Sequence, residues 1–431
     1  MILAHAIGGR SDLPIPLSLL ITGATVVLVI TFLGLALMWT RPRLQDGPQV
    51  GPSLGRPPTS LLLRGLGLVG LILVIGQAIV PLLGAERASA RPTIAPVSVW
   101  VLFWLVIPFA GAVLGDWYSE INPWRSLARL GRVGRFERIG ALDRAGVWPA
   151  AAVLVGFAWL ELIGPFAGDP VALGLTALCY TIFLLVAMSL VGRETGLAVF
   201  DAFTPYNRLF SAISPLGRNR EGSVVWRGWL RSLPVVPEWP GLWVLVVAMI
   251  ATVSYDGVSG TSWFESVTGG LGGSIAGDTF LLLATINLIA LGYYLTCLAA
   301  ARFAGDDWTA ARVAQRFAHT LVPIALAYAL AHYFTLVLFE GQQILAAASD
   351  PFGLGWDLLG TAERRVDYFI RTSRPIWFLQ VAFIVGGHLV GVVLAHDRSL
   401  RDFGRDALRS QYAMLVLMIA LTSLGLVILS G

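Results

Sequence analysis

The stretch FAHTLVPIALAYALAHYFTLVLFEGQ, residues 317–342, decides the fold class of this chain. It is long and apolar enough to cross the ~30 Å hydrocarbon layer of a membrane, for which a helix needs about 20 residues. It nevertheless carries His319, His332 and Glu340. Ionisable side chains are rare at membrane depth and often mark functional sites, so the stretch predicts a membrane protein and directs attention to these three residues.

The composition extends this prediction to the whole chain. Of 431 residues, 56% are hydrophobic and 13% are charged, whereas soluble domains hold about 25% charged residues. We therefore predict one all-α integral membrane domain over residues 1–431, a polytopic transmembrane helix bundle of about ten spans. The predicted spans lie near 17–39, 61–84, 97–117, 147–167, 170–191, 241–263, 279–301, 317–341, 376–396 and 411–430.

The arginine residues predict the orientation of the bundle, because positively charged residues are enriched in cytoplasmic loops. All 30 basic residues are arginine, and most lie in the loops that follow the odd-numbered spans. Both termini are therefore expected outside. The net charge of +4 follows this topology, so it indicates no nucleic-acid partner. The lack of lysine suggests a GC-rich bacterial genome, and a lipid bilayer, the bacterial cytoplasmic (inner) membrane, is the expected location.

The segments outside the spans are short, and two of them share a pattern. In 118–146, Asn122 precedes a proline, Trp124 and Arg125; in 192–240, Thr204 precedes Pro-Tyr. A polar cap followed by proline is typical of a helix start. Short helices in the cytoplasmic interface are therefore predicted, and they could bind a membrane protein partner. The segment 342–375 is expected to be an external loop over the bundle.

Several ionisable side chains fall inside the predicted spans. His332 and His388 differ by about 8 Å in predicted depth, with Glu340 two turns beyond His332. Imidazoles bind zinc, copper, iron and haem, and a carboxylate could complete such a site or relay protons. A transition metal or haem is therefore the suspected cofactor, while Glu161 and Asp256 are candidates for a polar cavity or proton relay.

Two further histidines lie nearer the membrane boundary. His319 and His396 fall at the cytoplasmic ends of their spans and are expected to be interfacial or secondary residues. His319 and His332 lie about 140° apart around a straight helix, so an arrangement of two stacked haems fits poorly.

Longer motifs resemble a known family. HAIGGRSDLPIP (5–16), GDWYSEINPWRSL (115–127), AHYFTLVLFEGQ (331–342), SDPFGLGWDLLGTAERRVDY (349–368) and VGGHLVGVVLAHDR (385–398) are similar to bacterial polytopic membrane proteins commonly labelled fenitrothion hydrolase. The resemblance implies hydrolysis of an organophosphorus triester, a reaction that usually uses metal-activated water. The residues that it implies for metal ligation or for the catalytic base are His332, His388, Glu340 and Asp350.

Three functions stay open from the sequence. The first is an intramembrane His/carboxylate site that handles a metal ion, haem or protons. The second is the hydrolase implied by the resemblance, with Glu340 and Asp350 as catalytic candidates and an unknown small-molecule substrate. The third is an assembly or structural subunit of a larger membrane complex.

Overall fold

The computed structural model describes residues 15–48, 51–55, 60–85, 87–88, 92–219, 222–305, 307–368 and 374–430. The N-terminal motif that begins at His5 lies outside these residues. Within them, nine helices are long and apolar enough to cross a membrane. A further apolar helix, α8 (Trp148–Leu162), has 15 residues. The chain is therefore an all-α, polytopic membrane protein, as its composition predicts.

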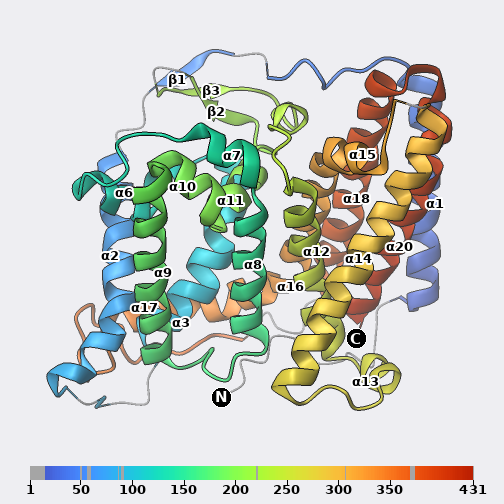
Figure 1. Cartoon of the computed structure of the whole chain (residues 1–431). Helices are drawn as coiled ribbons and strands as arrows, with labels where there is room; N and C mark the ends of the chain where they lie inside the picture. The colour runs from blue at the N-terminus through green and yellow to red at the C-terminus, as the bar shows by residue number, and fades with distance from the viewer. Residues whose placement is uncertain are drawn as a thin grey trace.

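The long helices form two groups that stand side by side (Figure 1). The first group consists of α2 (Ser60–Ile79), the span Ile94–Leu114, α8 and α9 (Pro170–Val191). The second consists of α1 (Leu17–Met38), α12 (Leu242–Ser259), α14 (Ile275–Ala304), α16 (Val322–Phe339), α18 (Arg374–Asp402) and α20 (Tyr412–Ser430).

The span Ile94–Leu114 is not a uniform α-helix. It consists of α3 (Ile94–Pro96), the π-helix η2 (Val97–Val106) and α4 (Ile107–Leu114). Helices of the π type are rare and are usually limited to one turn, and they often occur at functional sites. The sequence predicts the span but not this change of helix type, because the apolar residues of 97–106 suit either geometry.

The arginine-rich loops gather at one end of the bundle, called here the arginine-rich face. Helix α6 (Pro123–Leu130) begins as predicted, with the Asn122 side chain accepting a hydrogen bond from the backbone N–H of Arg125. Helix α11 (Phe203–Ser211) begins earlier than predicted and is not capped by Thr204. Instead, the Thr204 hydroxyl donates to the Asp201 carboxylate, which accepts from the backbone N–H of Phe203.

The arginine-rich face also carries a small sheet that the sequence did not predict (Figure 1). The strands of the sheet are β1 (Ser53–Gly55), β2 (Leu216–Arg218) and β3 (Val224–Trp226). They pair antiparallel in the order β1-β3-β2.

This face also carries short helices. They include α5 (Tyr118–Ile121), α7 (Ile139–Ala145), α10 (Arg193–Phe200), η3 (Leu233–Val235), α15 (Ala310–Phe317), η4 (Ala318–Leu321), η6 (Gly404–Asp406) and α19 (Ala407–Ser410).

The opposite face carries the remaining short helices. The predicted external loop 342–375 begins with η5 (Glu340–Gln342) and α17 (Gln343–Ser349). After α17 the chain forms a series of turns over residues 350–363. The other short helices at this end are η1 (Pro81–Leu83) and α13 (Ser262–Thr268).

Helix α12 joins the two groups. All but a few of its residues are buried, and it packs against α8 of the first group and against α14 and α16 of the second. Helix α11 and the π-helix also contact α16. Polar side chains on α8, α11, α12 and α16 therefore meet in the interior of the protein, where lipid does not reach them.

The first long helix packs against the last two. Helix α1 contacts α18 and α20. The loop that follows α1 is held by the fully buried Asp397 of α18, whose carboxylate accepts hydrogen bonds from Trp39 Nε1 and from the backbone N–H groups of Arg43 and Leu44. Gln45 Nε2 donates a fourth.

Candidate functional site

The strongest candidate site is a buried polar cluster at the joint between the two helix groups. His332 Nε2 of α16 lies 2.9 Å from Asp256 Oδ2 of α12. The hydroxyl of Tyr333 donates to the same oxygen at 2.8 Å. The side chains of His332 and Asp256 are only 9% and 7% exposed. Two adjacent residues of α16 thus contact one carboxylate on the neighbouring helix.

Glu161 of α8 brings a second acidic group to this place. It is buried, and its carboxylate is close enough to interact electrostatically with Asp256 and Tyr333. Among the described residues, Glu161 Oε1 has no hydrogen-bond partner. Glu161, Asp256, His332 and Tyr333 are called the acid–histidine cluster below.

The cluster extends toward α11 and the π-helix through aromatic rings. Tyr206 of α11 is buried and interacts electrostatically with Glu161. Its ring stacks on Trp104 with ring centroids 5.1 Å apart and an interplanar angle of 17°. The stacked rings of Tyr206 and Trp104 thus link Glu161, which is itself buried, to α11 and the π-helix.

The chemistry of this arrangement favours proton binding. A buried, ionised carboxylate without a hydrogen-bond partner is costly, because the interior replaces water with a medium of low dielectric constant. The Asp256 charge is balanced by hydrogen bonds from His332 and Tyr333. A proton on Glu161 would remove the remaining cost, and histidine and carboxylate side chains inside membranes commonly carry protons in pumps and transporters.

The predicted grouping of His332, His388 and Glu340 is not found. Helix α16 presents Ala327 and Ala331 to α18, whereas its His332 contacts α12. His388 lies beside the ring of Tyr328, and its Nδ1 contacts the carbonyl oxygen of Ile384. Within the described part of the chain, no three His, Cys, Asp or Glu side chains are grouped so that they could hold a metal ion.

Glu340 and Asp350, the two catalytic candidates, belong to local turns. The Glu340 carboxylate accepts a hydrogen bond from the Gln343 amide three residues later. Asp350 is buried, and its two carboxylate oxygens accept from the backbone N–H groups of Leu354 and Gly355 at 2.8 and 2.9 Å. Asp350 therefore stabilises the turn after α17, and neither residue contacts His332 or His388.

His319 and His396 lie near the arginine-rich face but are buried among protein groups and not exposed at an interface. His319 Nδ1 contacts the carbonyl oxygen of Arg316 at 3.1 Å. Both ring nitrogens of His396 face oxygen atoms, the side-chain oxygen of Gln411 and the carbonyl oxygen of Trp39. His396 thus joins α18 to the chain next to α1 and α20, which is a structural role.

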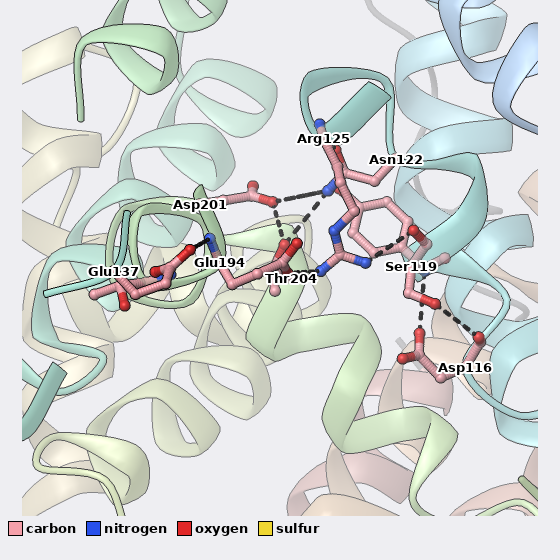
Figure 2. Close-up of polar contacts among 10 residues, drawn as sticks. Asp116, Ser119, Asn122, Arg125, Glu137, Glu194, Asp201 and Thr204 are labelled. Atoms are coloured by element: carbon pink, nitrogen blue, oxygen red, sulfur yellow. Dashed lines mark hydrogen bonds and ion pairs between the residues drawn. The ribbon is translucent and has the colours of Figure 1, made fainter. Parts of the chain in front are cut away.

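A second polar network lies at the arginine-rich face and is centred on Asp201 (Figure 2). Asp201 is fully buried, and its carboxylate accepts hydrogen bonds from Thr204 Oγ1 at 2.6 Å and from Tyr180 at 2.7 Å. Tyr118 and the predicted interfacial residue Asn122 lie at longer distances, 3.5 and 3.4 Å, from the same carboxylate. This network joins α5, α6, α9 and α11.

The other two predicted interfacial residues border this network. Arg125 donates to the carbonyl oxygen of Ser119 and forms an ion pair with Glu194 at 2.8 Å (Figure 2). Trp124 is buried, and its Nε1 donates to Thr181 of α9. Burial raises the pKa of Asp201, against the hydrogen bonds from Thr204 and Tyr180, which lower it.

Sequence reasoning missed two of the most connected residues, Asp201 and Tyr333. Asp201 stands at the end of α10 in a segment interpreted only as an interfacial helix start, and the Asp-x-x-Thr spacing before a proline was the available signal. Tyr333 directly follows His332, where its hydroxyl was an unassigned polar group within an apolar span.

Comparison with known proteins adds no relative: no protein-family model, curated protein or solved structure matches this chain. The resemblance to proteins labelled fenitrothion hydrolase therefore depends on the sequence motifs alone. The long apolar helices of the described residues indicate that the chain is a multi-pass membrane protein.

Proposed function

We propose that this protein binds and releases a proton inside the membrane at the acid–histidine cluster, and that it does so as part of proton-coupled work by a bacterial inner-membrane protein. The observation that supports this most directly is Glu161, a buried carboxylate with an unpartnered oxygen beside the Asp256–His332 pair. The cluster lies where the two helix groups meet, so a change in its charge acts on their shared interface.

Each member has a distinct role in this proposal. Glu161 exchanges the proton, and Asp256 and His332 form a pair whose hydrogen bond responds to the charge of Glu161. Tyr333 holds the Asp256 carboxylate in place through its hydroxyl. The arginine-rich face is assigned to the cytoplasm on the distribution of arginine.

Infrared difference spectroscopy of the protein in lipid nanodiscs tests this directly. Lowering the pH should produce a protonated-carboxyl C=O band that shifts in D2O and is lost in Glu161→Gln. The matched control is Asp278→Asn, which changes an acidic residue in the first turn of α14 whose carboxylate accepts a hydrogen bond from the backbone N–H of Gly273. A carboxyl band that does not change with pH, or one that persists unchanged in Glu161→Gln, would contradict proton exchange at this residue.

A second measurement links proton binding to function. Proteoliposomes that carry an internal pH-sensitive dye should acidify when a membrane potential is imposed, and this flux should be reduced at least tenfold in Glu161→Gln and in His332→Leu. The tenfold figure corresponds to about 1.4 kcal/mol, less than one charge-assisted hydrogen bond. Flux that is equal in wild type and in both folded variants would show that the cluster does not conduct protons.

A further inference from the structure

The first helix group forms an apolar cavity, open at the protein surface, that the acid–histidine cluster does not use. Its volume is about 700 Å³, within the range of pockets that bind small molecules. Its walls come from α2, the span Ile94–Leu114, α8 and α9, and they are almost entirely apolar. The π-helix contributes Val99, Phe103 and other residues at intervals of four, which places a continuous row of side chains along one wall.

The cavity has exposed lining residues on both α8 and α9. These helices are joined by a short loop, yet α8 packs mainly against α12 and α9 packs mainly against α2. Gly156 of α8 and Thr176 of α9 both line the cavity and are exposed at the protein surface. Because the surface around membrane-spanning helices faces hydrocarbon, a molecule dissolved in the bilayer can enter here without crossing water.

Glycines keep this space free. A Cβ atom at Gly70 of α2 or at Gly156 would meet no atom within 4 Å, so both positions have room for a side chain. Both line the cavity. Larger residues here would occupy the cavity without clashing with the backbone.

Positive charge gathers at the end of the cavity near the arginine-rich face. Trp124 lines the cavity, and the next residue along α6 is Arg125. Arg64 of α2 forms an ion pair with Glu120 at 2.8 Å, and Arg125 forms one with Glu194.

Arg129 adds a further positive charge beside these two ion pairs. It is exposed on α6 and forms no ion pair within the described residues. Burial of part of the side chain and the nearby positive charges of Arg64 and Arg125 lower the pKa of Arg129, and the nearby Glu194 and Glu120 offset this only in part. An anionic group placed here would relieve this repulsion.

We propose that the cavity binds one acyl chain of an anionic phospholipid, which enters between α8 and α9, with its phosphate beside Arg129 and Arg125. An apolar cavity reached from the bilayer selects a hydrocarbon chain, and unbalanced arginine charge at the cytoplasmic leaflet selects a phosphate headgroup. The inference does not depend on proton binding at Glu161.

Photo-crosslinking tests this proposal. The full-length protein is reconstituted with phosphatidylglycerol or phosphatidylcholine that carries a diazirine on one acyl chain, and labelled peptides are mapped by mass spectrometry. Phosphatidylglycerol should label residues of the cavity wall, such as Phe157 and Tyr180. Gly70→Leu and Gly156→Leu should lower this labelling at least fivefold, whereas Gly65→Leu should not, because Gly65 lies on the same helix as Gly70 but outside the cavity.

The headgroup is tested with a second pair of variants. Arg129→Gln should reduce the preference for phosphatidylglycerol over phosphatidylcholine about fivefold, the effect expected for one arginine near an anionic lipid surface. Arg132→Gln, which removes a charge from the loop after α6, should have little effect. Equal labelling by both lipids in the wild type would overturn the headgroup assignment.

The cavity assignment has its own refuting result. Labelling of the cavity wall that is unchanged in Gly70→Leu and Gly156→Leu, both shown to be folded by circular dichroism and gel filtration, would mean that the chain lies outside the cavity. Loss of labelling with Gly65→Leu as well would have the same consequence.

Discussion

The contact between Asp256 and His332 predicts a measurable coupling energy. The perturbations are Asp256→Asn and His332→Leu, alone and together, because asparagine keeps an acceptor for Tyr333 and leucine replaces the imidazole with an apolar side chain. The two side chains lie 2.9 Å apart and are less than a tenth exposed, so solvent screens the contact very little.

The expected magnitude follows from this burial. A hydrogen bond to a charged group contributes about 1.5–3 kcal/mol, and removal of one partner of a buried ion pair costs about 3–5 kcal/mol in soluble proteins. In membranes, interhelical hydrogen bonds couple by only about 0.6 kcal/mol on average, since the unfolded chain finds other partners. For a charge-assisted contact we expect each single variant to lose about 2–3 kcal/mol and the coupling energy to be about 1–2 kcal/mol.

The assay is reversible unfolding in mixed micelles of dodecyl maltoside and SDS, with the free energy of unfolding taken from each transition. The control cycle combines Asp256→Asn with His388→Leu, because the His388 ring contacts Tyr328 and the carbonyl oxygen of Ile384 and therefore belongs to another packing site. These two changes should be additive within about 0.5 kcal/mol. A coupling energy for Asp256 and His332 no larger than that of the control cycle would refute the reasoning that they form one unit.

Three further predictions concern pH dependence and helix packing. Burial alone would raise the pKa of Glu137, but hydrogen bonds from the first backbone N–H groups of α10 outweigh this effect and lower the pKa. Glu137→Gln should therefore lower the free energy of unfolding by about 0.5 kcal/mol above pH ~4.5, after allowance for the exposure of the side chain, and by little at lower pH. The raised pKa of Asp201 has the opposite sign, so its contribution to stability should fall as pH rises from ~3.8 through the folded pKa. Asp201→Asn should therefore remove a fall in stability with rising pH, whereas Glu137→Gln should remove a rise. Profiles of unfolding free energy against pH that change in the same direction in both variants would contradict both assignments. A methyl group at Gly387 would collide with Ala327 across the contact between α16 and α18, so Gly387→Ala should destabilise the protein by about 1–3 kcal/mol in the same micelle assay, while Gly386→Ala, with open space around it, should not.

The helices could be predicted from the sequence because membrane spans are specified locally. Helix α9 begins and ends at the predicted residues, where Asp169 caps its first turn and Gly192, with φ 99°, ends it. The start of α11 was predicted wrongly because the Asp201 carboxylate, not Thr204, accepts the first free backbone N–H.

The site could be predicted only in part, because its geometry depends on which helices are neighbours. Glu161 and Asp256 were identified as polar residues at membrane depth, but His332 pairs with a residue 76 positions away. No local pattern encodes that pairing. The depth of His388 suggested a partnership with His332, whereas the direction of each side chain around its helix, which depth does not reveal, separates them.

The packing of α1 against α18 and α20 has a consequence for the biogenesis of the protein. Helix α1 leaves the ribosome first, but its packing partners and Asp397 are synthesised near the end of the chain. At 5–20 residues per second, the delay between them is roughly 20–70 s. During this time α1 stands in the bilayer without its native neighbours, and the second helix group is completed only when translation is nearly finished. Truncation of the last two helices should therefore leave an inserted but unclosed chain, a ready substrate for membrane quality-control proteases.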